Sequence, residues 1–246
     1  MSGDQYWQTV GQWEEFFNTG HKGNTNVDCN NDSRTKRHGQ NSQPAQPNPD
    51  EVLLIQAVKK PLSFKSKDWR PCTKADPMGS ILVTDSSPVI VGAMQRTKKP
   101  IIVIDDFQYI LANEFMRRVL DQETGNAAFA KYNEIARHAW DILMAAGKLA
   151  DNSRVYILAH TQQDESGHVK AKTIGKLLDE KITMEGLLTI VLRTAVINGQ
   201  YLLSTQNNGM DTVKSPMGMF EDEHIPNDLA AVDAAICEYY GLTAIN

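Results

Sequence analysis

The sequence has few cysteines, no long apolar run and no excess of positive charge. Its three cysteines, Cys29, Cys72 and Cys237, are far apart and form no CxxC pair. Neither a zinc site nor a disulfide framework is therefore indicated, and a reducing compartment fits best. No apolar run approaches the roughly 18 residues that cross a bilayer, and the first ten residues do not resemble a signal peptide. We expect a cytoplasmic protein with no membrane partner.

The charge balance limits how the protein can bind nucleic acid. Lys and Arg number 25 against 30 Asp and Glu, which gives a net charge of −5. A global positive field is thus excluded, and any contact with DNA must come from a local patch. Lys170, Lys172 and Lys176 form a candidate patch for phosphate or single-stranded DNA. The alternative is that these lysines are a solvated helix start.

Composition divides the chain near residue 50. Residues 20–49 are mostly Asn, Gln, Ser, Pro and charged residues, which bury too little apolar surface to fold and predict disorder. Residues 4–18 carry aromatic and apolar side chains at roughly helical spacing, which predicts a short amphipathic helix. We therefore separate an atypical, largely disordered segment, residues 1–49, from a folded core, residues 50–246.

In the core, short apolar runs alternate with longer helical patterns. The expected elements are strands at 52–58, 101–104 and 155–159, helices at 114–121, 129–149 and 176–188, and a helix or strand at 88–95. Asn198-Gly199 predicts a type I′ turn in a hairpin formed by 189–196 and 201–205. The alternation predicts an α/β fold with a mainly parallel sheet, flanking helices and an antiparallel edge hairpin.

Two acidic residues end the apolar run at 101–104, in the form of a Walker B strand. Such a strand delivers Asp105 to the carboxyl edge of the sheet, where it can hold Mg²⁺ that bridges nucleotide phosphates. Asp106 would then stand where a general base polarises the attacking water. The alternative is an ordinary buried strand that ends in an Asp-containing turn, because such endings are common in α/β folds.

The apolar run at 155–159 also ends in polar residues, His160, Thr161 and Gln162. Parallel strands end at the same edge of a sheet, so these residues should face Asp105 across the crevice where ligands bind. One of them could then sense the γ-phosphate of a nucleotide. A capped or merely solvated histidine is the alternative for His160.

Longer stretches of the chain resemble a family of phage-encoded RecA-like P-loop ATPases, the single-strand annealing and recombination ATPases. These stretches are IVIDDFQYILANEFMRR, KTIGKLLDEKITMEGLLTIVL, TQNNGMDTVKSPMGMFED and IPNDL, in the family's order over about residues 50 to 240. The resemblance implies a RecA-like fold, binding of ATP and Mg²⁺, and action on single-stranded DNA in the host-cell cytoplasm. It also implies a homo-oligomer, with a phage single-strand-binding protein as a further partner.

The resemblance also implies roles for particular residues. Asp105 binds Mg²⁺ and nucleotide, and Asp106 has a catalytic or water-orienting role. His160 and Thr161 stand at the end of the strand that senses the nucleotide, His160 as a catalytic residue and Thr161 as a cofactor contact. Lys214 follows the hairpin and reaches nucleotide across a subunit interface.

The phosphate-binding loop of such ATPases, GxxxxGK[ST], occurs nowhere in the 246 residues. Without it the backbone cradle and the lysine that hold the triphosphate are missing. We therefore expect the chain as written not to hydrolyse ATP. The alternative is a non-enzymatic single-stranded-DNA-binding or scaffold protein.

Codon degeneracy suggests why the loop is absent. If the codons of residues 34–47 are read one base downstream, the permitted translations include Gly-x-Ser-Gly-Thr-Gly-Lys-Thr, a complete phosphate-binding loop in the position that the family requires. The codons of residues 30–33 permit an apolar strand before it. Residues before about 48 would then be a frame-shifted rendering of the original sequence, and a natural extension is the alternative.

Overall fold

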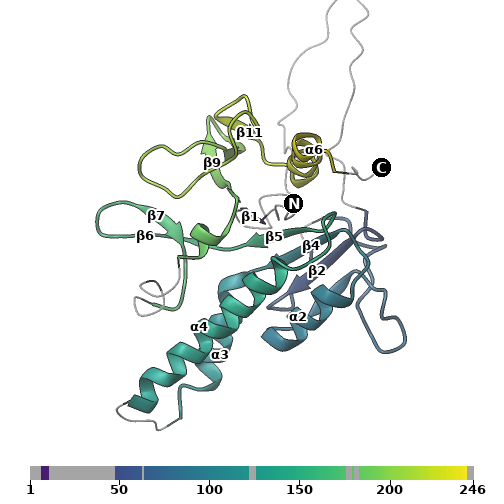
Figure 1. The fold of residues 1–246 in the computed structure, drawn as a ribbon, viewed down its shortest axis with the longest axis vertical. Helices are drawn as coiled ribbons and strands as arrows, with labels where there is room; N and C mark the ends of the chain where they lie inside the picture. The colour runs from purple at the N-terminus through teal and green to yellow at the C-terminus, as the bar shows by residue number, and fades with distance from the viewer. Residues whose placement is uncertain are drawn as a thin grey trace, which may run out of the picture.

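Six parallel strands form the centre of the protein (Figure 1). This computed structural model describes residues 7–10, 48–62, 64–121, 126–175, 179 and 183–242. The order across the sheet is β3 (Ile81–Val83), β2 (Val52–Gln56), β4 (Ile101–Asp105), β5 (Arg154–Leu158), β1 (Trp7–Val10) and β8 (Ile190–Val191). Every pairing between neighbours in this sheet is parallel, as the sequence predicts for its main part.

Both faces of the sheet are covered, which explains why β2, β4 and β5 are buried at every position. Alternate residues such as Ile55 and Ile104 pack against α2 (Ser87–Arg96), α3 (Phe107–Arg117) and α4 (Asn126–Ala146). The intervening residues, such as Leu54 and Val103, belong to a second core beneath α6 (Leu229–Tyr240). Figure 1 shows α6 on the opposite side of the sheet from the other helices.

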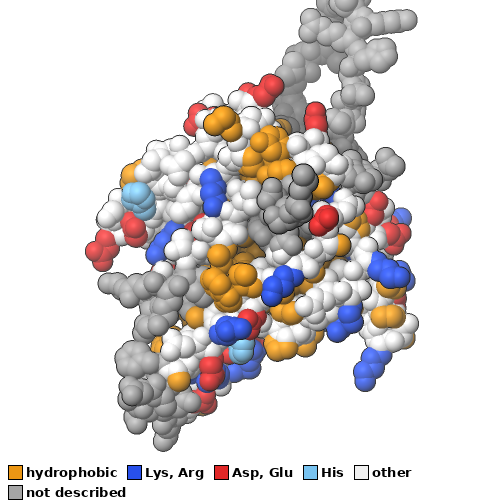
Figure 2. All heavy atoms as spheres, viewed as in Figure 1, with side chains coloured by type: hydrophobic (Ala, Val, Ile, Leu, Met, Phe, Trp, Pro, Cys, Tyr) orange, Lys and Arg blue, Asp and Glu red, His pale blue; other side chains and the backbone are white. Residues whose placement is uncertain are grey.

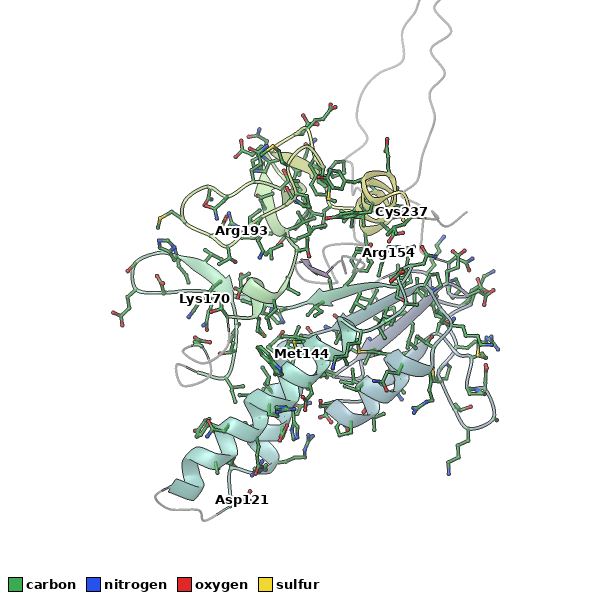
Figure 3. The ribbon with its side chains drawn as sticks, viewed as in Figure 1. Asp121, Met144, Arg154, Lys170, Arg193 and Cys237 are labelled. Atoms are coloured by element: carbon green, nitrogen blue, oxygen red, sulfur yellow. The ribbon has the colours of Figure 1, made fainter. Side chains whose placement is uncertain are left out.

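A buried ion pair fixes α6 to the sheet. The Nε of Arg154 lies 2.5 Å from Oδ1 of Asp233, and the hydroxyl of Tyr156 donates a hydrogen bond to the same oxygen. Cys237, one turn further along α6, lies beside this group (Figure 3). Because Arg154 and Asp233 are both buried, the charge of each is stabilised by the opposite charge of the other.

The predicted hairpin forms, but not at the edge of the main sheet. Its strands are β9 (Arg193–Ile197) and β10 (Gln200–Ser204), and Asn198 and Gly199 have the positive φ angles, 52° and 77°, that the turn requires. They make a separate antiparallel sheet with β11 (His224–Pro226). The expected edge position is wrong because Leu203 of β10 packs into the core beneath α6, which holds the hairpin over the sheet.

The prediction of an amphipathic helix over residues 4–18 is wrong at Trp7–Val10, because these residues form strand β1. The backbone of these residues pairs with β5 on one side and β8 on the other. Trp, Thr and Val suit a strand, and pairing on both sides outweighs the helical spacing of the sequence. Strand β1 is therefore a further parallel strand, between β5 and β8, that the sequence does not predict. Residues 11–47, which include all of the segment expected to be disordered except residues 48 and 49, lie outside the described residues.

The helices differ from expectation mainly at their ends. Residues 88–95 are helical, and α3 begins at Phe107 rather than Glu114 because Phe107, Ile110 and Leu111 are buried against the sheet. The helix expected at 176–188 is described only at Asp179 and as the 3₁₀ turn η1 (Met184–Leu187). No helix within the described ranges is both long enough and apolar enough to cross a bilayer.

Candidate functional site

The carboxyl ends of β2 and β4 form a topological switch point. The two strands are neighbours, yet the chain leaves β2 toward β3 on one side and leaves β4 toward β5 on the other. Ligands of open parallel sheets bind in the crevice that such divergent connections leave. Gln56 and Asp105, the last residues of the two strands, pair at this point. The topology therefore places the acidic end of β4 where a ligand site is expected.

Asp105 is buried without a hydrogen-bond partner for its side chain. The residue is 0% exposed, and neither carboxylate oxygen is hydrogen-bonded within the described part of the chain. Burial, and then the negative charge of Asp106, raise the pKa of Asp105 to about 7. The ammonium of Lys60, the amide of Gln56 and the backbone N–H of Asp106 lower this pKa, but among the described residues none of them meets the carboxylate with hydrogen-bond geometry. A buried carboxylate of this kind is stabilised by a proton or by a cation.

Asp106 adopts a backbone conformation that is uncommon for residues other than glycine. It precedes α3 with φ 57° and ψ 46°, in the left-handed region, and its side chain does not cap the helix. Such a conformation costs of order 1 kcal/mol or more and marks functional sites when the surrounding structure holds it. The carboxylate instead lies 2.6 Å from Nζ of Lys60 and 3.4 Å from Nε2 of His160. Asp106 thus combines a left-handed backbone with a carboxylate that lies next to two basic side chains.

Two hydrogen bonds fix the surroundings of Asp106. The side-chain amide of Gln56 donates to the backbone carbonyl of Lys60, which holds the loop after β2 at the end of the strand. On the other side, the backbone N–H of His160 donates to Oε1 of Gln108. Gln108 is buried on α3, and its Nε2 has no partner among the described residues. The carboxyl ends of β2 and β4 therefore have beside them an unsatisfied amide donor as well as the unsatisfied carboxylate, among the described residues.

The structure brings together three of the residues that the sequence nominates, Asp105, Asp106 and His160. Thr161 is exposed in β6 (Thr161–Gln163), where it pairs with β7 (Val169–Ala171). It lines a different, small cavity together with Glu185.

Lys214 lies beside the edge strand β8, away from β4 in the order of strands. Its backbone pairs with Val191 of β8, and its side chain is exposed. The order of strands separates β8 from β4 by two strands, which is roughly 14 Å. Lys214 is therefore not part of the candidate site of its own chain, and its role across a subunit interface remains a prediction.

The candidate DNA patch is partly neutralised. Lys170 pairs with Asp179 at 2.9 Å, and this contact raises the pKa of the lysine. Asp179 also accepts hydrogen bonds from Gln162 and from the hydroxyl of Thr173. Lys172 is exposed, and Lys176 lies outside the described residues. One of the three lysines that we considered for phosphate contacts, Lys170, is thus already neutralised by an acidic residue of the same chain.

Lys60 and Gln56 belong to the candidate site but are not among the residues predicted from the sequence. Their only signal is position, because a polar residue ends a fully buried strand and a lysine follows four residues later. Which strand lies beside β2 decides whether that lysine meets an acid. The sequences of β2 and β4 do not by themselves predict that these two strands pair.

Asp105 and Asp106 suit a metal ion that is bound as a complex with the phosphates of a substrate. Within the described ranges, no group of three or more His, Cys, Asp and Glu side chains is arranged to hold a metal. Mg²⁺ commonly uses one or two carboxylates, with waters and substrate phosphates as its other ligands.

A scan against protein-family models finds no match to this chain, and a search of the curated proteins finds none either.

Proposed function

We propose that this chain is a phage RecA-like ATP-binding protein of DNA recombination and single-strand annealing. In this proposal the carboxyl ends of β2 and β4 bind the phosphates of ATP together with Mg²⁺. The observation that carries the proposal is the buried Asp105 carboxylate, which has no hydrogen-bond partner among the described residues and ends a parallel strand at a switch point. The resemblance of residues 50–240 to that family supplies the biological role.

The side chains around the crevice have distinct chemical capacities. Asp105 and Asp106 would hold Mg²⁺, which when bound neutralises phosphate charge. Lys60 is 29% exposed at its side chain and pairs with Asp106 from a loop, so its ammonium can move to a phosphate oxygen. Asp106 and His160 lie close enough to share a proton taken from a water molecule in the crevice.

Hydrolysis needs more than these side chains. A γ-phosphate must be positioned, and the sequence has no GxxxxGK[ST] loop to do so. We therefore propose that the chain as written does not turn over ATP, and that a frame shift before about residue 48 accounts for the loss. Single-stranded DNA, a second copy of the chain and a phage single-strand-binding protein are the proposed partners.

Magnesium-dependent ATP turnover tests this proposal. The chain as written should remain at background, whereas a gene repaired by one restored base should yield an active protein. Asp105→Asn should abolish the restored activity, and Asp151→Asn, a change of an exposed carboxylate, should leave it intact. Turnover of about 1 s⁻¹ by the chain as written would contradict the proposal.

The alternative is a non-enzymatic protein that binds single-stranded DNA or acts as a scaffold. The ion pair between Lys60 and Asp106 favours it, because the most accessible carboxylate of the crevice already has a cation. Binding of single-stranded DNA that is unchanged by ATP, Mg²⁺ and Asp105→Asn would support this alternative.

A further inference from the structure

A cavity of about 460 Å³ opens at the β3 edge of the main sheet, away from the candidate site. It lies between β2, β3, α2 and the loop that precedes β3. Part of its lining is apolar and open to solvent, since Met78 is 57% and Val89 is 44% exposed. Such apolar lining favours a ligand with an apolar group that can enter the cavity.

Basic side chains surround the same cavity. Lys74, Arg96 and Lys99 line it, and in the described part of the chain neither Lys74 nor Arg96 has an ion pair. The nearby carboxylate of Asp76 is already paired with a different arginine, Arg70, at 2.6 Å. Figure 2 shows basic and hydrophobic side chains together on this flank of the molecule. The chemistry that fits this basic cavity is an apolar anchor next to acidic groups.

One turn of this chain has that chemistry. The acidic turn, residues 216–223, carries Met217, which is 96% exposed, and the exposed acids Glu221, Asp222 and Glu223. None of these acids has an ion pair among the described residues. The backbone carbonyl of Met217 accepts a hydrogen bond from the hydroxyl of Tyr239 at 3.1 Å. The anchor is therefore presented on an ordered backbone, which reduces the entropy lost on binding.

The acidic turn and the basic cavity face opposite sides of the sheet. Met219 of the turn belongs to the core beneath α6, whereas the cavity lies beside α2 on the other face (Figure 1). A molecule cannot bring its own turn to its own cavity in this fold. Two copies can, in a head-to-tail contact that leaves one turn and one cavity free at the ends.

We propose that the acidic turn of one copy docks in the basic cavity of a second copy. Met217 enters the apolar part of the cavity, and the acids of the turn face Lys74 and Arg96. This contact rests on the proposed function in so far as that names a second copy as a partner. It needs no nucleotide, so a failure of ATP binding would leave it unchanged.

Sedimentation of the full chain at increasing concentration tests the contact. Association should weaken with salt, because it pairs opposite charges near the surface. Met217→Ser should weaken association about ten- to hundredfold, since it removes one buried anchor. Met116→Ser is the matched control, because Met116 is 62% exposed on α3, and it should change nothing.

A mixing experiment separates this head-to-tail contact from a symmetric one. The variant Met217→Ser keeps an intact cavity, and the double variant Lys74→Glu, Arg96→Glu keeps an intact turn. Each should associate poorly alone, whereas a mixture should form one-to-one pairs that grow no further. All changes are at exposed positions, and thermal melting confirms that each variant is folded.

Three results would overturn the proposal. The first is a wild-type chain that stays monomeric throughout the micromolar range. The second is association that both variants leave unchanged, which would assign the acidic turn and the cavity to other partners. The third is a mixture of the two variants that associates no better than either variant alone.

Discussion

Replacing Asp105 by Asn should make the folded protein more stable at neutral and alkaline pH. The wild-type carboxylate is buried and lacks a hydrogen-bond partner among the described residues, so its ionised form is unfavourable in the folded state. Asn has the shape of the protonated acid and carries no charge. The substitution therefore removes the charged form and leaves the packing of the strand unchanged.

The magnitude follows from the raised pKa. The pKa of Asp105 is about 7 in the folded protein against an ordinary value of 3.8. Between these values the folded state holds a proton that the unfolded state has lost, so the free energy of unfolding falls as pH rises. Each pKa unit corresponds to about 1.4 kcal/mol, which gives a loss of roughly 4 kcal/mol that is complete above about pH 7. Below about pH 4 the loss disappears.

Urea denaturation of the wild type and of Asp105→Asn over a pH series measures this difference. The variant should be about as stable as the wild type near pH 4, and its advantage should grow to roughly 4 kcal/mol near pH 8. Asp151→Asn, at an exposed position, should show no such pH dependence. A difference between Asp105→Asn and the wild type that is constant across the series would refute the reasoning.

Lys60→Met removes a cation that lowers the pKa of Asp105, so carboxyl NMR titration should show that pKa rising further. Asp233→Asn leaves the buried guanidinium of Arg154 without its partner and should lower the free energy of unfolding by about 3 to 5 kcal/mol in urea denaturation, whereas an unchanged value would show that the ion pair adds no stability. The gene should carry CAA at the codon of Gln40, because CAG would place arginine where the shifted phosphate-binding loop needs lysine.

The parts of the fold that were predicted correctly depend on strong local patterns. The runs ending at Asp105 and before His160 are fully apolar, so both were expected to be buried parallel strands. Because parallel strands end at one edge, the sequence predicts that His160 faces Asp105; in the structure its Nε2 lies 3.4 Å from the neighbouring carboxylate, that of Asp106. The turn at Asn198 was equally readable, since few residue pairs accept its backbone angles.

The parts that were missed depend on contacts between distant segments. Strand β1 (Trp7–Val10) exists because β5 and β8 stand on either side of it, and nothing in its own sequence names those partners. Lys60 enters the site because Gln56 holds the loop and because β2 lies beside β4. The left-handed backbone of Asp106 likewise follows from the junction of β4 with α3 rather than from a motif.

Binding of Mn²⁺ with a non-hydrolysable ATP analogue, followed by electron paramagnetic resonance, tests the central claim most directly. Mn²⁺ takes the oxygen ligands that Mg²⁺ uses, and its free and bound signals are distinct. With the repaired protein, the account predicts Mn²⁺ binding that requires the analogue and weakens at least about tenfold in Asp105→Asn, as expected for loss of one charged ligand. Asp151→Asn should bind as the repaired protein does. Equal affinity in Asp105→Asn and the repaired protein would contradict the claim that the end of β4 holds the metal and its phosphates.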